Sequence, residues 1–423
     1  MAMASKRKQP PAPLFDQIVF APDREAVPGA RRVISWDEED EAPYLKAIEE
    51  VATMRATLTR RDHHHGSWAE LDLSSFGVDP LRMGAESTLL KERWQAARPI
   101  LLPGLFADFP EEEAQVGLAM AESLLEPGGL SNWLKQRKGP PPSDFAPATP
   151  EPTSDERALE KISFERKNGP ALWTMSSRLS RVDNDASLRC RVSFGREVDD
   201  DASFDRDSHL DVTRLAEFAL PGALRIDLDP GLGEILKTLV TDETYLTQHI
   251  AYWNAPNGGA LMHHDAFAEE NNGGQLGVVY TQLSGTTAWL CLSIEDLADR
   301  IEDYLEFLGE GGADWVRKAL WPERRDLERL QARAHNRAAF LAELATPGCG
   351  RFGPLVNYGP DFSSFLADAG HAFFVRAGDS LLMPSHGLAN CAMHSVFCAS
   401  DERTYAISAA LRSRSDPNSA DNQ

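Results

Sequence analysis

The sequence has no long apolar run. Nowhere in its 423 residues does an apolar stretch approach the roughly 18–20 residues that a membrane-spanning helix needs, so we expect no membrane partner. The polar segment Ser5 to Pro11 also lacks the apolar core of a secretory signal peptide. These absences argue against a membrane or secreted protein.

Cysteine is scarce and forms no CxxC pair. An odd number of scattered cysteines does not indicate a disulfide framework, and reduced thiols are typical of the cytosol. We therefore predict a cytoplasmic location. The five cysteines are Cys190, Cys291, Cys349, Cys391 and Cys398.

Positive charge is also low. The chain carries 43 Lys and Arg against 65 Asp and Glu, a formal net charge of −22. Such a chain is unlikely to bind nucleic acid or an anionic membrane, so we expect neither as a partner. Acidic residues gather at Asp199 to Asp207 and at Glu269-Glu270, where they would attract a cationic substrate.

Short strand patterns dominate from about residue 220, and two helical patterns interrupt them. We predict an α+β fold whose core is a double-stranded β-helix (jelly-roll, cupin-like), with N-terminal helices and an inserted helical hairpin. The expected regions are a flexible Pro-rich tail at 1–30, a mainly helical region at 31–170, the first part of the jelly roll at 171–292, the helical insertion at 293–345, the second part of the jelly roll at 346–415, and a polar tail at 416–423.

One short stretch carries the strongest chemical signal. His263 and Asp265 are two residues apart, so on a strand both side chains point the same way. An imidazole and a carboxylate on one face need one more imidazole to form the 2-His-1-carboxylate triad of non-haem Fe(II) oxygenases. We predict that His263, Asp265 and a distal histidine are metal ligands and the catalytic centre.

Three histidines compete for the third position. His394 begins an alternating strand pattern, His386 lies in a Gly-containing loop, and His371 comes before the Gly378 turn. A ligand belongs on a rigid strand, which favours His394. His264 would point away from the ion unless a bulge exchanges it with His263.

These residues lie in an ordered set of motifs that resembles the JmjC-type, cupin-like Fe(II)- and 2-oxoglutarate-dependent oxygenases. His263-His264-Asp265 matches their HxD motif, and Gln282 to Gly285 matches the Q-x-x-G segment that follows it. Arg98 to Phe106 is similar to their N-terminal entry, and Gly378 to Pro384 to the strand before the distal histidine. Two departures are clear: Thr287 stands where the family often has a lysine that binds 2-oxoglutarate, and His394 follows Pro384 at a greater distance than usual.

The resemblance implies Fe(II), 2-oxoglutarate and O2 as cofactors, and hydroxylation of an unactivated carbon in a protein, peptide or amino-acid substrate. The far carboxylate of 2-oxoglutarate needs a fixed cation, for which the guanidinium fork of arginine is suited. We predict Arg403 for this role, with Arg412 as the alternative. Hydroxyl donors for the cosubstrate are sought among Tyr280, Thr287, Tyr405 and Ser408.

Other functions stay open on the sequence alone. Thr287 leaves room for a cupin metalloenzyme without 2-oxoglutarate, such as a dioxygenase, lyase or isomerase. A small-metabolite hydroxylase and a cupin-like binding protein are further alternatives. The insertion at 293–345 would cover the barrel, act as a lid or form a homodimer.

Overall fold

The structure, a computed structural model, describes most of the chain after residue 86. The described residues are 87–137, 145–151, 158–166, 171–178, 189–196, 209–240, 244–254, 259–267, 275–309, 324–358 and 371–413, apart from 125, 399 and 401, together with 18–21, 55–58 and the single residues Phe362, Leu366 and Ala369. The acidic cluster at Asp199 to Asp207, Glu269-Glu270 and the polar tail at 416–423 lie outside them.

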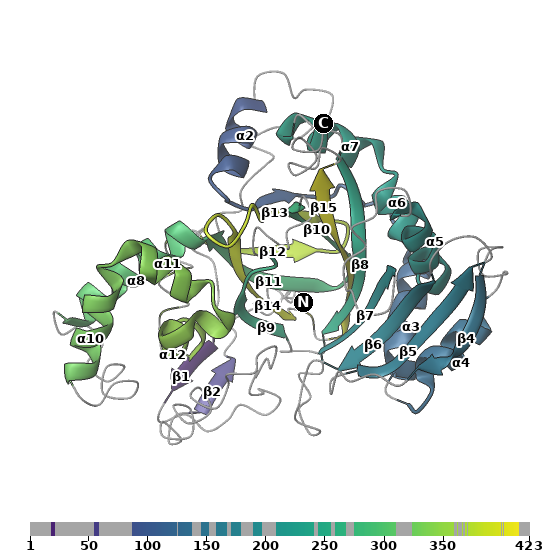
Figure 1. The fold of residues 1–423 in the computed structure, drawn as a ribbon, viewed down its shortest axis with the longest axis horizontal. Coiled ribbons are helices and arrows are strands. Elements are labelled where there is room, and N and C mark those ends of the chain that lie inside the picture. The colour runs from purple at the N-terminus through teal and green to yellow at the C-terminus, as the bar shows by residue number, and fades with distance from the viewer. Residues whose placement is uncertain are drawn as a thin grey trace, which may run out of the picture.

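These residues fold into antiparallel sheets and helices, as Figure 1 shows. The larger sheet has nine strands in the order β3-β13-β10-β15-β8-β7-β6-β5-β4. Their bounds are β3 (Ile100–Leu102), β4 (Phe145–Glu151), β5 (Ala158–Arg166), β6 (Leu172–Arg178), β7 (Arg189–Arg196), β8 (Thr244–Asn254), β10 (Gln275–Ser284), β13 (Ser380–Pro384) and β15 (Thr404–Ser413).

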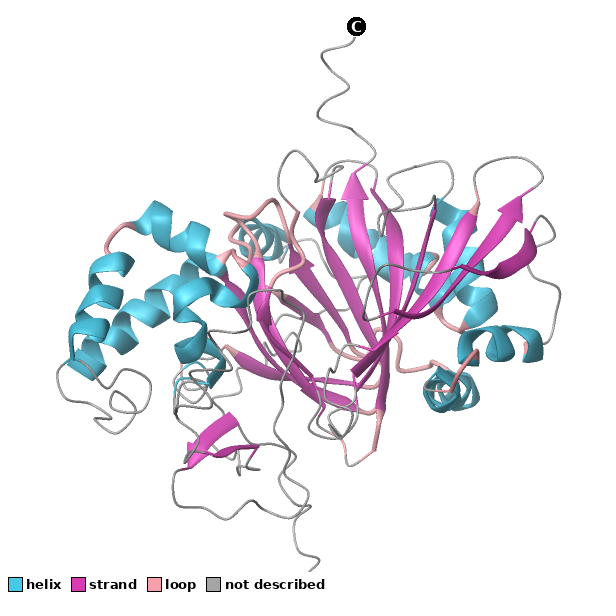
Figure 2. Ribbon diagram, turned by 60° about the horizontal axis from the view of Figure 1, so that its bottom comes forward, coloured by secondary structure: helices cyan, strands magenta, loops and turns pink. Residues whose placement is uncertain are grey.

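A smaller sheet of four strands has the order β12-β11-β14-β9. Its strands are β9 (Gly259–His263), β11 (Thr286–Ser293), β12 (Ala372–Arg376) and β14 (Ala392–Cys398). Side chains of both sheets join one buried core, which includes Val278 and Tyr280 from the larger sheet and Trp289 and Val396 from the smaller one. The two sheets therefore face each other, as the turned view in Figure 2 shows. A separate pair, β1 (Ile18–Ala21) and β2 (Arg55–Leu58), completes the strands.

Helices cover the outer face of the larger sheet. They are α2 (Ser87–Gln95), α3 (Glu111–Leu124), α4 (Gly129–Gln136), α5 (His209–Ala219), α6 (Ala223–Asp227) and α7 (Pro230–Leu239). Trp253 of β8 donates from Nε1 to the Gly117 carbonyl at 2.8 Å, and the Tyr405 hydroxyl of β15 donates to the Pro221 carbonyl at 3.2 Å. Gly117 is required for this packing, because a Cβ there would lie 2.2 Å from the Tyr405 ring.

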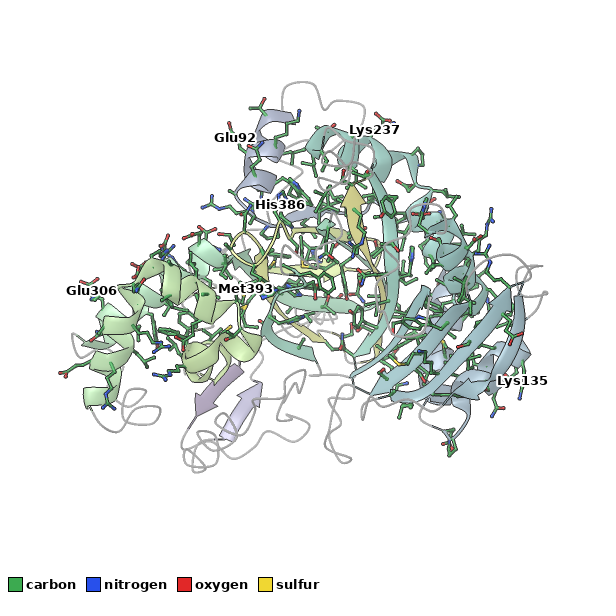
Figure 3. The ribbon with its side chains drawn as sticks, viewed as in Figure 1. Glu92, Lys135, Lys237, Glu306, His386 and Met393 are labelled. Atoms are coloured by element: carbon green, nitrogen blue, oxygen red, sulfur yellow. The ribbon has the colours of Figure 1, made fainter. Side chains whose placement is uncertain are left out.

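A second group of helices lies between β11 and β12 in the sequence. It consists of α8 (Ile294–Gly309), α10 (Arg324–Ala334), α11 (Arg337–Leu344), the 3-10 helix η3 (Pro347–Phe352) and α12 (Gly353–Tyr358). The Ser293 hydroxyl accepts from the Asp296 N–H at 2.9 Å and so caps the start of α8. Apolar side chains at helical spacing give these helices their own core, with Met393 of β14 at its base (Figure 3).

The structure corrects the expected regions at three points. The insertion is more than a hairpin ending at 345, since its helices continue to Tyr358. The region 31–170 contains strands as well as helices, because 145–166 includes β4 and β5. Pro147 and Pro150 make β4 hard to recognise as a strand in the sequence. Both are tolerated because β4 is the edge strand of its sheet. Within the tail at 1–30, residues 18–21 form β1.

None of the described helices is long and apolar enough to cross a membrane.

Candidate metal centre

The pairing of β9 with β14 places two histidines side by side. His263 ends β9 and lies directly opposite His394 of β14, with ring centroids 4.2 Å apart. Asp265 follows β9 rather than continuing it, which differs from the expectation that both residues share one regular strand. The structure nevertheless brings His263, Asp265 and His394 together, with one potential ligand atom from each within 4.8 Å of the others.

The distances within this cluster decide whether one ion fits. The Asp265 carboxylate has Oδ1 3.9 Å from His263 Nε2 and Oδ2 3.6 Å from His394 Nε2. Two atoms that bind one ion at about 2.1 Å can be at most about 4.2 Å apart. Both separations are therefore compatible with a shared ion.

Burial keeps the third imidazole in its neutral form. His394 is 2% exposed, and desolvation, followed by the nearby His263, lowers its pKa to about 3. Its Nδ1 lies 3.4 Å from the Ala392 carbonyl oxygen, which leaves Nε2 facing Asp265. A neutral imidazole with Nε2 presented is the form that ligates a metal.

His264 points away from the cluster toward the helical insertion. Its Nε2 lies 2.9 Å from the Ala345 carbonyl oxygen, and its Nδ1 accepts from the Ala266 N–H at 3.1 Å. The second contact closes a turn around Asp265, which explains why the strand stops at His263. The structure therefore places His263, and not His264, in the cluster.

The two rival histidines also lie elsewhere. His386 follows β13 in a loop, and its ring packs on Trp94 of α2 at 5.6 Å (Figure 3). His371 precedes β12, where its carbonyl accepts from the Cys291 N–H at 2.9 Å. Neither belongs to the cluster of potential ligands found among the described residues.

A small pocket of about 30 Å³ adjoins the three residues. Its remaining lining consists of the aromatic Tyr252, Tyr280 and Trp289, the apolar Val278, Met383 and Val396, and the polar Asn254 and Ser408. Strand register gives the pocket two ends. Asn254 pairs with Thr404 at one end of β15, and Val278 pairs with Ala410 nearer the other end.

Arg403 does not line this pocket, contrary to our expectation. Ser408 of β15 lines the pocket, whereas Arg403 directly precedes β15 and is not among the lining residues. Its Nη1 lies 3.4 Å from the exposed carboxylate of Glu122 on α3. Tyr405 does not line the pocket either, because its hydroxyl reaches Pro221 behind the sheet.

Arg412, the alternative cation, shares a face of β15 with Ser408. It is fully buried, and its Nη2 donates to Gln248 Oε1 at 3.0 Å. Gln248, with a φ of 50°, lies in the irregular part of β8 opposite the Ser408–Ala410 segment. The guanidinium therefore reaches back along the strand toward the Val278 end of the pocket.

Thr287 and Tyr280 belong to a closed hydrogen-bond network around Gln282. Gln282 Oε1 accepts from the Tyr280 hydroxyl at 2.7 Å and from the Thr287 hydroxyl at 2.9 Å. Its Nε2 donates to the carbonyls of Ser284 and Tyr405. Thr287 is buried and outside the pocket lining, so it does not fit the predicted contact with a cosubstrate, whereas Tyr280 does line the pocket.

The same network reaches the candidate ligand His394. Trp289 Nε1 donates to Thr287 Oγ1 at 2.8 Å, and the Trp289 ring stacks on the His394 ring at 5.4 Å and 30°. The sequence indicated Gln282 only as part of a motif and gave Trp289 no role. The available signal was the alternation along β11, which puts Thr287, Trp289 and Cys291 on one face.

Comparisons with known proteins add little to this geometry. No family model matches the chain, and no curated protein matches its sequence. Among solved structures, the chain is similar to a non-heme alpha ketoglutarate dependent epimerase, SnoN, from nogalamycin biosynthesis. The sequence identity is 13% and the TM-score 0.33, with 78% of this chain and 83% of that chain covered.

Two further structures are similar at the same low level. One is SnoN in complex with Fe3+, alpha ketoglutarate and nogalamycin RO, at 13% identity and a TM-score of 0.32, covering 78% of this chain and 84% of that one. The other is an oxidoreductase of the 2OG-Fe(II) oxygenase family from Burkholderia pseudomallei, at 8% identity and a TM-score of 0.27, covering 77% and 89%. TM-scores of this size assign no function, so the site itself has to carry one.

Proposed function

We propose that this chain is a mononuclear non-haem Fe(II) oxygenase that uses 2-oxoglutarate and O2. The observation that supports it is the convergence of His263, Asp265 and His394 beside a pocket. Two imidazoles and one carboxylate with open positions favour Fe(II) over a closed structural zinc site. The two facing antiparallel sheets suit the double-stranded β-helix of JmjC-type and cupin-like oxygenases, which is part of the proposal.

The chain supplies the geometry of this site. His263, Asp265 and His394 would hold the iron, which supplies the oxygen chemistry when bound. Trp289 supports the His394 ring from one side, and the Gln282 network fixes Trp289 in turn. Val278, Met383 and Val396 give the pocket an apolar wall that excludes water.

The cosubstrate would lie toward one end of the pocket. Its far carboxylate would approach the Val278 end, where the guanidinium of Arg412 replaces our first expectation, Arg403. Tyr280 and Ser408 line the pocket, although the Tyr280 hydroxyl donates to Gln282. Arg412→Lys would keep the charge and lose the fork, so we expect weaker 2-oxoglutarate binding with unchanged iron content.

A second candidate is a cupin metalloenzyme without 2-oxoglutarate. The observation that favours it is that, among the residues that the structure describes, neither Lys nor Arg lines the pocket itself. Succinate formation separates the two. An iron-loaded protein that turns over a substrate without consuming 2-oxoglutarate would establish the second candidate.

The substrate, partners and compartment remain proposals. We propose hydroxylation of a protein, peptide or amino-acid substrate, with a small metabolite as the rival. The described cysteines Cys291, Cys349, Cys391 and Cys398 are buried and form no disulfide with one another, and a cytoplasmic location belongs to the proposal. A homodimer through the helical insertion is a further prediction.

The deciding experiment measures iron under anaerobic conditions. Wild type should bind one Fe(II), and Asp265→Ala should lose it, because the carboxylate lies between both imidazoles. His264→Gln is the matched control, since His264 contacts Ala345 instead. If Asp265→Ala keeps full iron while His264→Gln loses it, the ligand assignment is wrong.

A further inference from the structure

One side chain in the pocket has uncommitted hydrogen-bonding groups. Asn254, the last residue of β8, lines the pocket and is only 3% exposed. Its Oδ1 is buried without a hydrogen-bond partner in the part of the chain that the structure describes.

A second uncommitted group lies beside it. Thr404 pairs directly with Asn254 across β15 and β8, so both side chains share a face, with Cβ atoms roughly 5 Å apart. Thr404 is 1% exposed, and its Oγ1 also lacks a partner. The two groups together form what we call the Asn254 subsite, at the opposite end of the pocket from Arg412.

An unpartnered buried polar group costs roughly 1–3 kcal/mol in stability. Native proteins leave few such groups, and each one at a pocket wall calls for a ligand that completes it. Other buried polar groups without a partner, such as Ser177 Oγ and the ring nitrogens of His249, do not line the pocket. Asn254 differs because its Oδ1 has no partner and the residue also lines the pocket.

The chemistry of the subsite selects its ligand. A carboxamide offers one acceptor and two donors without charge, and Thr404 adds a hydroxyl that does both. A carboxylate would leave Asn254 Oδ1 unpaired, and an ammonium group would leave the amide donors unpaired. An amide satisfies both kinds of group at once.

We propose that the Asn254 subsite binds an amide group of the substrate, either a peptide bond or a side-chain carboxamide. This inference rests on the proposed function in assigning the other end of the pocket to the cosubstrate. It narrows the substrate class to amide-containing molecules and makes Asn254 a specificity-determining residue.

The test uses the full chain loaded with Zn(II) and 2-oxoglutarate and labelled with 15N-asparagine. The probes are N-methylacetamide and methyl acetate, which match in shape and differ in the N–H donor. Side-chain NH2 signals in NMR spectra report binding, and Asn254→Leu identifies the signal of Asn254. Exposed Asn132 on α4 provides the control signal, which should not move.

We expect N-methylacetamide to bind at least about tenfold more tightly than methyl acetate, which corresponds to one hydrogen bond of ordinary strength. Asn254→Leu should remove this preference, and Thr404→Val should reduce it. Acetamide as a third probe separates the two sources: tighter acetamide indicates a side-chain carboxamide, and tighter N-methylacetamide indicates a peptide bond.

Equal binding of the amide and the ester, or a preference that survives in Asn254→Leu, would overturn the proposal. Because Zn(II) supports no oxygen chemistry, this result is independent of turnover. Loss of succinate formation in the Fe(II) protein with an intact amide preference would instead count against the proposed oxygenase. Both variants should stay folded, since each removes a buried polar group that has no partner.

Discussion

Two walls of the pocket treat their polar groups in opposite ways. In the β10–β11 wall, Tyr280 and Trp289 line the pocket and are joined to Gln282 and Thr287 by a chain of hydrogen bonds, in which the Gln282 amide uses both of its terminal atoms. In the β8–β15 wall, Asn254 and Ser408 line the pocket, and the Oδ1 of Asn254 and the Oγ1 of its neighbour Thr404 have no hydrogen-bond partner among the described residues. Three of these strands belong to the larger sheet, and β11 belongs to the smaller one.

The difference separates a wall that is held rigid by its own hydrogen bonds from a wall whose polar groups are open to a ligand. A satisfied buried network rigidifies what it touches, and this one ends on the Trp289 ring against His394. An unsatisfied wall is less stable alone and gains its partners from a ligand. Under the proposed function, the β10–β11 wall would position the candidate ligand His394, and the β8–β15 wall would face the substrate.

Breaking the satisfied wall should have the largest effect. Gln282→Leu keeps the approximate volume but strands the hydroxyls of Tyr280 and Thr287 and two backbone carbonyls. We expect roughly 3–5 kcal/mol lower stability in urea unfolding. A loss below about 1 kcal/mol would show that the network is not a structural unit.

A second prediction concerns His249, a buried histidine that does not line the pocket, and the dependence of folding stability on pH. Burial, then His209, lowers the pKa of His249 from 6.5 to about 3. Between these values the unfolded imidazole binds a proton and the folded one does not, so stability is complete above about pH 6.5 and falls as the pH decreases. The slope is roughly 1.4 kcal/mol per pH unit.

His249→Leu should remove that slope, as measured by unfolding at pH 7 and pH 5. Asp227 gives an opposite slope, because burial raises its pKa to about 6 and its stabilising effect is lost as the pH rises. The difference between wild type and variant isolates His249. Identical pH profiles would contradict the assignment.

A smaller effect is expected at the link between network and ligand. Trp289→Phe keeps a ring against His394 and deletes the Nε1 donor to Thr287. We expect a loss of about 1 kcal/mol with unchanged iron stoichiometry. Loss of iron binding here would mean that the indole, rather than the aromatic ring alone, positions His394.

The smallest effect should come from the unsatisfied wall. Thr404→Val and Asn254→Leu remove groups that have no partner, so thermal unfolding should show no change or a gain of up to about 1 kcal/mol. A clear destabilisation by either variant would erase the contrast between the two walls.

Local patterns predicted that His263, Asp265 and His394 lie together, and the structure groups them, although Asp265 follows β9 instead of sharing its regular strand. Their role as metal ligands stays a prediction. The helices of the insertion were found from their apolar period, as at Ile294, Leu297 and Ile301.

Residues whose role depends on register were missed. Arg403 was assigned to the pocket from its place in the sequence, although it directly precedes β15 and is not among the lining residues. Asn254 was not singled out, since the sequence does not show that it lies opposite Thr404 on the neighbouring strand. The Gln282 network joins strands whose pairing only the fold defines.

The helical insertion leaves the smaller sheet after Ser293 and returns to it at Ala372, on the neighbouring strand. In polymer terms it is a long loop whose ends the sheet has already closed. The entropy of closing such a loop grows only with the logarithm of its length, about 0.6 kcal/mol for each doubling. The chain can therefore change length here at low cost while β9 and β14, which carry His263 and His394, keep their register.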